Sequence, residues 1–89
     1  MERKIIISLL DKVMKLQKNG HYAAFELSNY GTDISIYAMK GGFRMEDGYD
    51  FSEYLMLTDS ENALSTLIQL DEIIEEWGEN NNELQASEG

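Results

Sequence analysis

Three segments in the middle of this chain, residues 21–28, 32–39 and 50–57, alternate apolar and polar side chains. A period of two residues is the pattern of a β-strand that has one buried face. Gly31 lies in the short connection between the first two segments, and Gly41-Gly42 ends the second. We therefore expect a β-hairpin followed by a third antiparallel strand. One face of so small a sheet must be covered, because its apolar stripes would otherwise face water.

The segment before the strands has the period of an amphipathic helix. In residues 2–18 the apolar side chains recur three and four positions apart, and the lysines, Lys12 among them, point away from that face. Asn19-Gly20 is a good helix stop, because glycine accepts the left-handed conformation that ends many helices. The lysines near this end also suit the helix dipole.

The segment after the strands gives the clearest helical pattern. It begins with a predicted capping box, in which Thr58 caps the helix and Glu61 reaches back to it. The helix extends to Trp77 and is closed by Gly78. Asp71 is the one polar exception on its apolar face.

These elements predict an α+β domain with the order αβββα, a three-stranded antiparallel meander with both helices packed on one face. A chain of 89 residues is long enough for one domain only. We assign residues 1–78 to this domain. Residues 79–89 have no periodic apolar face, and we expect them to form an acidic, polar, disordered tail.

Few residues of the chain offer catalytic or metal chemistry. There is no cysteine, which excludes disulfides and thiolate metal sites. His21 is the only histidine, and a single histidine at the start of a strand is most often a surface or strand-end residue. The glycines after residue 39 lack the spacing of a phosphate-binding loop, and the acidic residues 46–50 lack that of an EF-hand. The sequence therefore predicts a protein that is not an enzyme and has no catalytic residue, cofactor or metal.

The net charge of −10 is divided unevenly along the chain. Residues 1–18 carry five bases and two acids, whereas residues 44–89 carry thirteen acids and a single base, Arg44. So acidic a chain repels phosphate backbones, which argues against direct binding of nucleic acid. The first apolar run stops at Leu10, too early for a signal peptide or a membrane span, so we expect a cytoplasmic protein. The acidic half either keeps the protein soluble or faces a host protein with a basic surface.

One candidate partner-binding surface is the sheet face opposite the helices. The alternation places tyrosines and methionines on this face, interspersed with acidic residues. Tyrosine and methionine are enriched where proteins meet, although tyrosine also suits the cross-strand packing of any sheet. Tyr37, Tyr54 and Met56 are the candidate apolar anchors, with Tyr22 and Met39 expected beside them.

A second candidate surface is acidic. Glu72, Glu75 and Glu76 follow one another along the last helix, and Asp47 and Asp50 lie in the loop before the third strand. Carboxylates on successive helical turns stand about 5–6 Å apart, close to the spacing of phosphates along a nucleic-acid strand. An ordinary solvated helix surface carries the same residue types, so imitation of a polyanion and simple solvation are both open.

A pattern in the hairpin resembles known proteins. Phe25-Glu26-Leu27-Ser28, Gly31, Ser35-Ile36 and Lys40-Gly41-Gly42-Phe43 form an aromatic–acidic strand start, a glycine turn and a Lys-Gly-Gly-aromatic strand end. This pattern resembles short uncharacterised proteins of phages and prophages of Gram-positive bacteria, which implies a phage origin and no catalytic residue. In size, acidity and αβββα order, the chain is also similar to small anti-CRISPR proteins that imitate DNA. That likeness is one of architecture and transfers no functional residue.

Together these features predict a phage-type binding protein that inhibits a host nucleic-acid-handling or defence protein, as anti-CRISPR proteins do. The acidic residues of the helix and the loop would steer the encounter with the basic host surface. Tyr37, Tyr54 and Met56 would anchor the complex. The alternative is a self-associating structural or accessory phage protein, in which the tyrosine–methionine face of the sheet is a homodimer interface.

Overall fold

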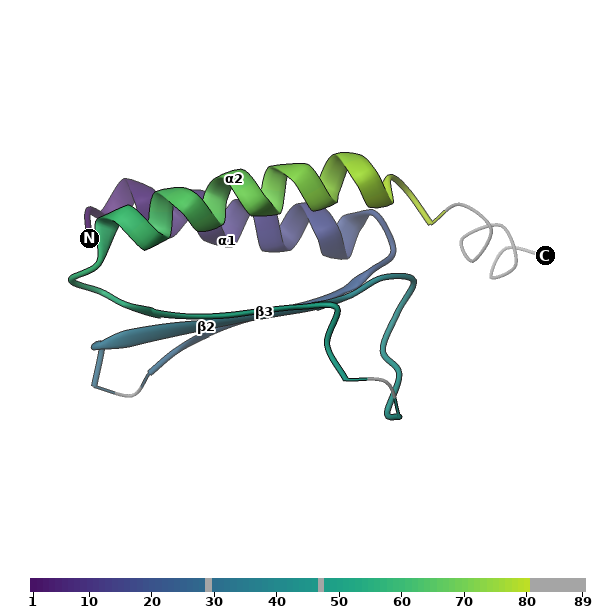
Figure 1. Ribbon diagram of the computed structural model, residues 1–89, viewed down its shortest axis with the longest axis horizontal. Helices are drawn as coiled ribbons and strands as arrows, with labels where there is room; N and C mark the ends of the chain where they lie inside the picture. Colours follow the sequence, from purple (N-terminus) through teal and green to yellow (C-terminus); the bar gives the residue numbers. More distant parts are fainter. Residues whose placement is uncertain (29, 47, 81–89) are drawn as a thin grey trace.

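The computed structural model describes residues 1–28, 30–46 and 48–80 of the chain. A three-stranded antiparallel sheet with the strand order β1-β2-β3 forms one layer, and two helices form the other. Both helices lie on the same face of the sheet (Figure 1). The α+β meander expected from the sequence is therefore confirmed. The elements are α1 (Arg3–Lys18), β1 (Tyr22–Leu27), β2 (Asp33–Met39), β3 (Phe51–Met56) and α2 (Ser60–Trp77).

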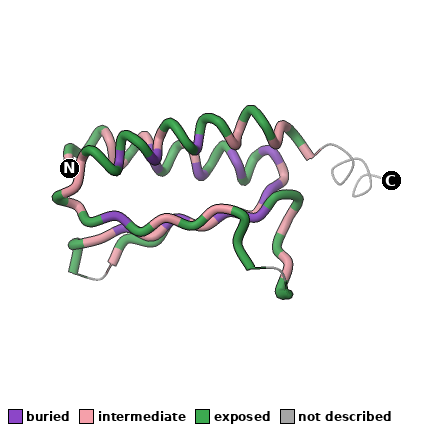
Figure 2. The backbone as a smooth tube through the Cα atoms, in the orientation of Figure 1, coloured by how far each residue is buried: buried purple, intermediate pink, exposed green. Residues whose placement is uncertain are grey.

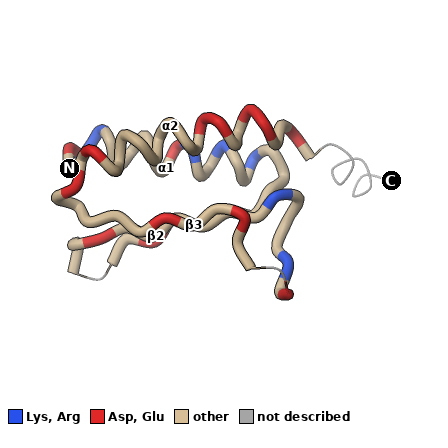
Figure 3. The backbone as a smooth tube through the Cα atoms, in the orientation of Figure 1, with Lys and Arg blue, Asp and Glu red and all other residues tan. Residues whose placement is uncertain are grey.

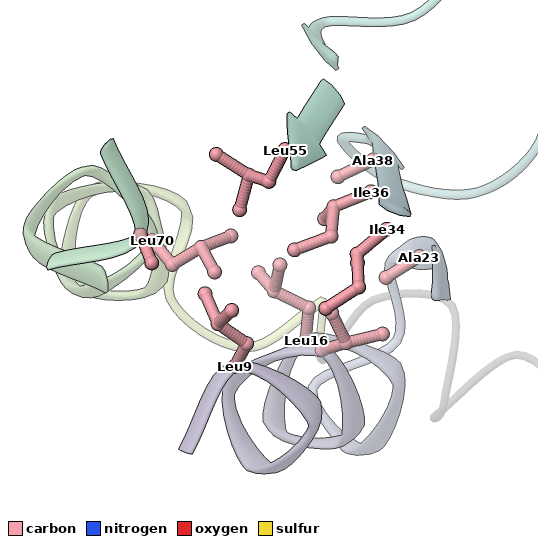
Figure 4. Close-up of a cluster of buried hydrophobic side chains, with 10 residues drawn as sticks. Leu9, Leu16, Ala23, Ile34, Ile36, Ala38, Leu55 and Leu70 are labelled. Carbon is pink, nitrogen blue, oxygen red and sulfur yellow. The ribbon is translucent and has the colours of Figure 1, made fainter. Parts of the chain in front are cut away.

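The core lies between the two layers, and the central strand β2 is its middle. Ile34, Ile36 and Ala38 of β2 are buried completely, as the alternation predicts. Buried positions follow the facing sides of both layers (Figure 2), and side chains from both helices and all three strands meet there (Figure 4). The rest of the buried cluster is Leu9, Val13 and Leu16 of α1, Ala23 of β1, Leu55 of β3, and Ala63 and Leu70 of α2.

The two helices run parallel and side by side, and two contacts fix their relative position. Near the middle of both helices, Lys12 of α1 forms an ion pair with Asp71 of α2, with 2.6 Å between Nζ and Oδ1. At the far end, the backbone N–H of Asn80 donates to the carbonyl of Asn19 at 2.7 Å. Asp71, the polar exception on the predicted apolar face, thus has a partner. Lys12, expected to turn away from the packed face, lies at the boundary with α2.

The end of α1 is where the sequence predicts it. Gly20 has a φ of 90°, a conformation that glycine adopts without the strain a Cβ would add. The N–H groups of Asn19 and Gly20 donate to the last carbonyls of the helix. A Cβ on Gly20 would also lie 2.9 Å from the Cβ of Asn80. This position therefore needs glycine both for its conformation and for the close approach of the chain after α2.

The start of α2 differs from the prediction in its capping residue. Asp59 is the N-cap, and its side chain accepts a hydrogen bond from the N–H of Asn62 at 3.1 Å. The expectation that Thr58 caps the helix was therefore wrong. The reason is the turn that ends β3, in which the N–H of Asp59 donates to the carbonyl of Met56. This turn places the Asp59 carboxylate, a strong N-cap acceptor, beside the free N–H groups of the first helical turn.

Replacing Ile36 by alanine should test the position of the core. Ile36 is fully buried at the centre of β2, so the variant leaves a cavity between the layers. We expect Ile36→Ala to lower the free energy of unfolding by about 2–5 kcal/mol, measured by urea titration with circular dichroism. The matched control is Leu27→Ala at the half-exposed end of β1, which should change it by less than about 1 kcal/mol. Equal losses in the two variants would show that the core lies elsewhere.

Candidate functional site

The C-terminal half of α2 and the residues after it carry four exposed carboxylates, which we call the acidic ridge: Glu72, Glu75, Glu76 and Glu79. Figure 3 shows how acidic positions gather along this part of α2. Among the residues that the structure describes, no ion pair includes a carboxylate of the ridge. The structure thus places Glu72, Glu75 and Glu76 together on one accessible stretch of helix.

The position of the ridge on the helix is unfavourable for the stability of α2. A helix carries partial negative charge at its C-terminal end, where acidic side chains are disfavoured and basic ones are favoured. Glu75 and Glu76 lie in the last turn of α2, which has no basic residue. α1 shows the opposite arrangement, with Lys15 and Lys18 in its last turn. Helix stability therefore does not explain the acidic residues of the ridge.

The loop acids predicted to join this surface have other positions. The Asp50 carboxylate accepts a hydrogen bond from the N–H of Lys40 at 2.8 Å and pairs with the Arg44 guanidinium at 2.7 Å. These two interactions, the Lys40 N–H above all, hold the pKa of Asp50 below its usual 3.8. Asp50 thus closes the loop between β2 and β3, and a neighbouring cation offsets its charge. Asp47 lies outside the described residues.

The role of Asp50 in the loop leads to a pH-dependent prediction. Its pKa is lower in the folded state, so its contribution to stability is present at neutral pH and is lost as the pH falls through the folded pKa. We expect Asp50→Asn to be less stable than the wild type at pH 7. The difference in unfolding free energy should shrink as the pH falls below 3.8, measured by urea titration at several pH values. A difference independent of pH would mean that the loop does not depend on this charge.

A groove of about 490 Å³ separates the end of α2 from this loop. Glu76 of the ridge and Asp50 of the loop both line it, so these two residues of the site expected from the sequence share one groove. Its lining is balanced in charge, however, because Lys40 and Arg44 lie in the same wall. The groove next to the ridge is therefore of mixed charge. The remaining lining residues are Ile73 and Trp77.

His21 has a structural position that the sequence did not indicate. It lies immediately before β1, at the strand end, but only 6% of its surface is exposed. Its Nδ1 accepts a hydrogen bond from the N–H of Gly41 at 2.9 Å, so its Nε2 carries the hydrogen and donates to the carbonyl of Gly78 at 2.7 Å. Its ring meets Trp77 edge to face at 5.3 Å. Of the two expected positions, the strand end holds and the surface does not, since His21 is buried where it joins the end of α2 to the loop after β2.

The loop after β2 lies on the side of the sheet away from the helices, at one end of the strands (Figure 1). Tyr49 of this loop stacks on Tyr37 with 4.5 Å between ring centroids, and Phe43 meets Tyr22 edge to face at 5.1 Å. Met39, expected as an exposed residue of this face, is buried, and its sulfur accepts a hydrogen bond from the N–H of Arg44. Tyr37 is half-buried by the same loop.

The other end of the open face carries the two remaining predicted anchors. Tyr54 is 61% exposed, and Met56 is exposed beside it in β3. The Tyr54 hydroxyl donates to the Asp33 carboxylate, which raises the pKa of Tyr54 above its ordinary value. The loop adds exposed apolar side chains that the sequence analysis did not include: Phe43, Met45 and Tyr49.

The two predicted surfaces thus lie on different layers of the molecule. The acidic ridge belongs to the helix layer, and Tyr54 and Met56 project from the face of the sheet that the helices leave open. Figures 1 and 3 show the helix layer and this open face on opposite sides of the fold. A single flat partner surface cannot contact both sets at once. The composite site expected from the sequence therefore divides into two separate candidate sites.

The fold and these surfaces define a small α+β domain with two candidate protein-binding faces. Across residues 1–28, 30–46 and 48–80, no three histidine, aspartate or glutamate side chains converge as metal ligands would. Neither α1 nor α2 is long and apolar enough to cross a bilayer. Comparison with protein-family models, curated proteins and solved structures gives no match.

Proposed function

We propose that this chain is a phage-type, non-enzymatic binding protein that inhibits a host nucleic-acid-handling or defence protein. The acidic ridge of α2 is the surface that would meet the basic surface of the host protein. The observation that carries the proposal is the position of the ridge: its carboxylates are exposed, lack ion-pair partners among the described residues, and crowd an end of α2 that disfavours them.

The geometry of the ridge suits a surface that normally binds a nucleic-acid backbone. Side chains three and four positions apart lie on neighbouring turns, which presents negative charge at intervals of about 5–6 Å. Charge complementarity of this kind raises the rate of association and selects the partner more than it adds affinity. Exposed charges are screened by salt, so the complex should weaken as the ionic strength rises.

The double variant Glu72→Lys/Glu75→Lys should abolish binding to the host protein without unfolding the chain. Each reversal replaces attraction to a basic surface by repulsion. Lysine is also the better residue in the last turn of a helix, where Glu75 lies, worth about 0.3–1 kcal/mol at that position, so α2 should keep or gain stability. The measurement is a pull-down of tagged protein from host lysate at low and moderate salt, with thermal unfolding of the same preparations.

The matched control is Glu26→Lys/Glu46→Lys, which makes the same change in net charge at exposed positions away from α2. It should retain the partner if the ridge is the binding surface. The captured protein should bind nucleic acid itself, and added duplex DNA should compete for it. Capture that survives the ridge reversal, or that both double variants lose equally, would contradict the proposal.

The second candidate function is self-association through the open sheet face, and the exposed side chains of Tyr54 and Met56 favour it. Phe43, Met45 and Tyr49 of the neighbouring loop enlarge this apolar surface. Exposed apolar patches of this kind often mark contact sites between proteins.

Tyr54→Glu should convert such a dimer to a monomer with unchanged circular dichroism. Tyr54 is well exposed, so a charge at this position costs more in a dimer interface than in the monomer, where it loses the hydrogen bond to Asp33 and repels its carboxylate. Size-exclusion chromatography with light scattering gives the mass. A Tyr54→Glu protein with the mass of the wild type would reject the sheet face as a dimer interface.

A further inference from the structure

The outer face of the helix layer, which points away from the sheet, carries apolar residues that the fold leaves uncovered. Ile7 of α1 is 46% exposed, and Leu64 and Ile68 of α2 are 50% and 61% exposed. Ile7 lies nine residues, two and a half turns, before the buried Leu16, so it projects on the opposite side of α1. These side chains form an apolar strip across both helices, outside the core.

The same outer face is mainly basic over α1, where Asp11, one turn after Ile7, is the acidic exception, and it is acidic over α2. Lys18 lies two and a half turns from the buried Leu9, and Lys4 lies two and a half turns from Val13, so both project outward. Glu72 stands in the same relation to the buried Ala63 of α2. Figure 3 shows basic positions along α1 and acidic positions along α2. Lys15 adds to the basic side, and Glu61, Glu75 and Glu79 add to the acidic side.

The parallel arrangement of the helices makes this face complementary to itself. A two-fold axis that runs along the helices, above their outer face, would place α1 of each copy on α2 of the other. Such a rotation keeps every residue at its level along the helix axis. The ion pair between Lys12 and Asp71 defines these levels, since it puts the two residues side by side.

In this arrangement, basic residues of one copy lie at nearly the same height along the helix axis as acidic residues of the other. Apolar residues of the two copies also lie at similar heights. At a rise of about 1.5 Å per residue, Lys15 and Lys18 fall within about one turn of Glu75, and Glu79 follows just past the end of α2. By the same measure, Ile7 falls between Leu64 and Ile68. Lys4 falls close to Glu61 at the other end.

We propose that the occupant of this face is a second copy of the chain, in a two-fold dimer that places the basic α1 of each copy on the acidic α2 of the other. Five of the seven bases of the chain lie in residues 1–18, so α1 is the surface of this protein that the ridge can attract. The inference rests on the proposed function in one respect: the second copy and the basic host protein would compete for the same ridge.

Reversal of charge on either helix should separate the dimer. Lys15→Glu/Lys18→Glu places like charges against the ridge, and Glu75→Lys/Glu79→Lys places them against α1. We expect each double variant to be monomeric in sedimentation velocity at protein concentrations where the wild type is a dimer. Circular dichroism of each variant should match that of the wild type.

Mixing the two variants gives the decisive measurement. In a mixed dimer, the glutamates of one α1 face the lysines of the other α2, and the second contact keeps its original charges. Two monomeric variants should therefore form a dimer together. A quadruple variant that carries both sets of changes should dimerise by itself.

Two results would overturn the proposal. The first is a wild-type protein that stays monomeric at the highest concentration at which it remains in solution. The second is a dimer that survives both double variants, which Tyr54→Glu would then assign to the sheet face. Failure of the proposed function is seen separately, because these measurements use the purified chain and need no host protein. If both proposals hold, Lys15→Glu/Lys18→Glu should capture more host protein than the wild type does, since its ridge is no longer occupied.

Discussion

Every other feature of this fold depends on the closure of one sheet face by two helices. Three strands separate α1 from α2, and a meander with an odd number of strands returns the chain to the end from which α1 started. The helices must therefore run parallel if both are to cover the same face. This arrangement places both C-terminal ends at one end of the molecule, where Lys15 and Lys18 of α1 lie near the acidic ridge of α2. The ion pair between Lys12 and Asp71 follows from it.

The sequence predicted those parts of the structure that depend on local periodicity. The alternation in β2 identified Ile34, Ile36 and Ala38 as core residues, and the left-handed preference of Gly20 marked the end of α1. The predictions failed where residues far apart in sequence meet. His21 is buried because Gly41 and Gly78 reach it across 20 and 57 positions of the chain, and no local signal encodes such contacts. Met39 is buried for the same reason, since the loop after β2 returns over the sheet.

The candidate site was predicted in its residue types and only in part in its arrangement. Sequence alone could place Glu72, Glu75 and Glu76 on one helix, because the helical period fixes their relative positions. It could not show that Asp50 is used to close a loop, nor that Tyr54 and Met56 lie on the opposite layer from the ridge. Those facts depend on the path of the loop and on the stacking of the layers, which long-range packing decides.

The acidic ridge has a basic counterpart in α1 of the same chain, and this affects which partner proteins the ridge can select. A carboxylate surface of this kind attracts any sufficiently basic protein, which by itself gives little discrimination between partners. If α1 of a second copy occupies the ridge, a partner must present a stronger positive surface than Lys4, Lys15 and Lys18 do in order to displace it. Weakly basic proteins would then be excluded by competition. Surfaces that bind nucleic acids are among the most positive on proteins, so self-pairing of this kind would favour host proteins whose nucleic-acid ligand the ridge resembles in charge.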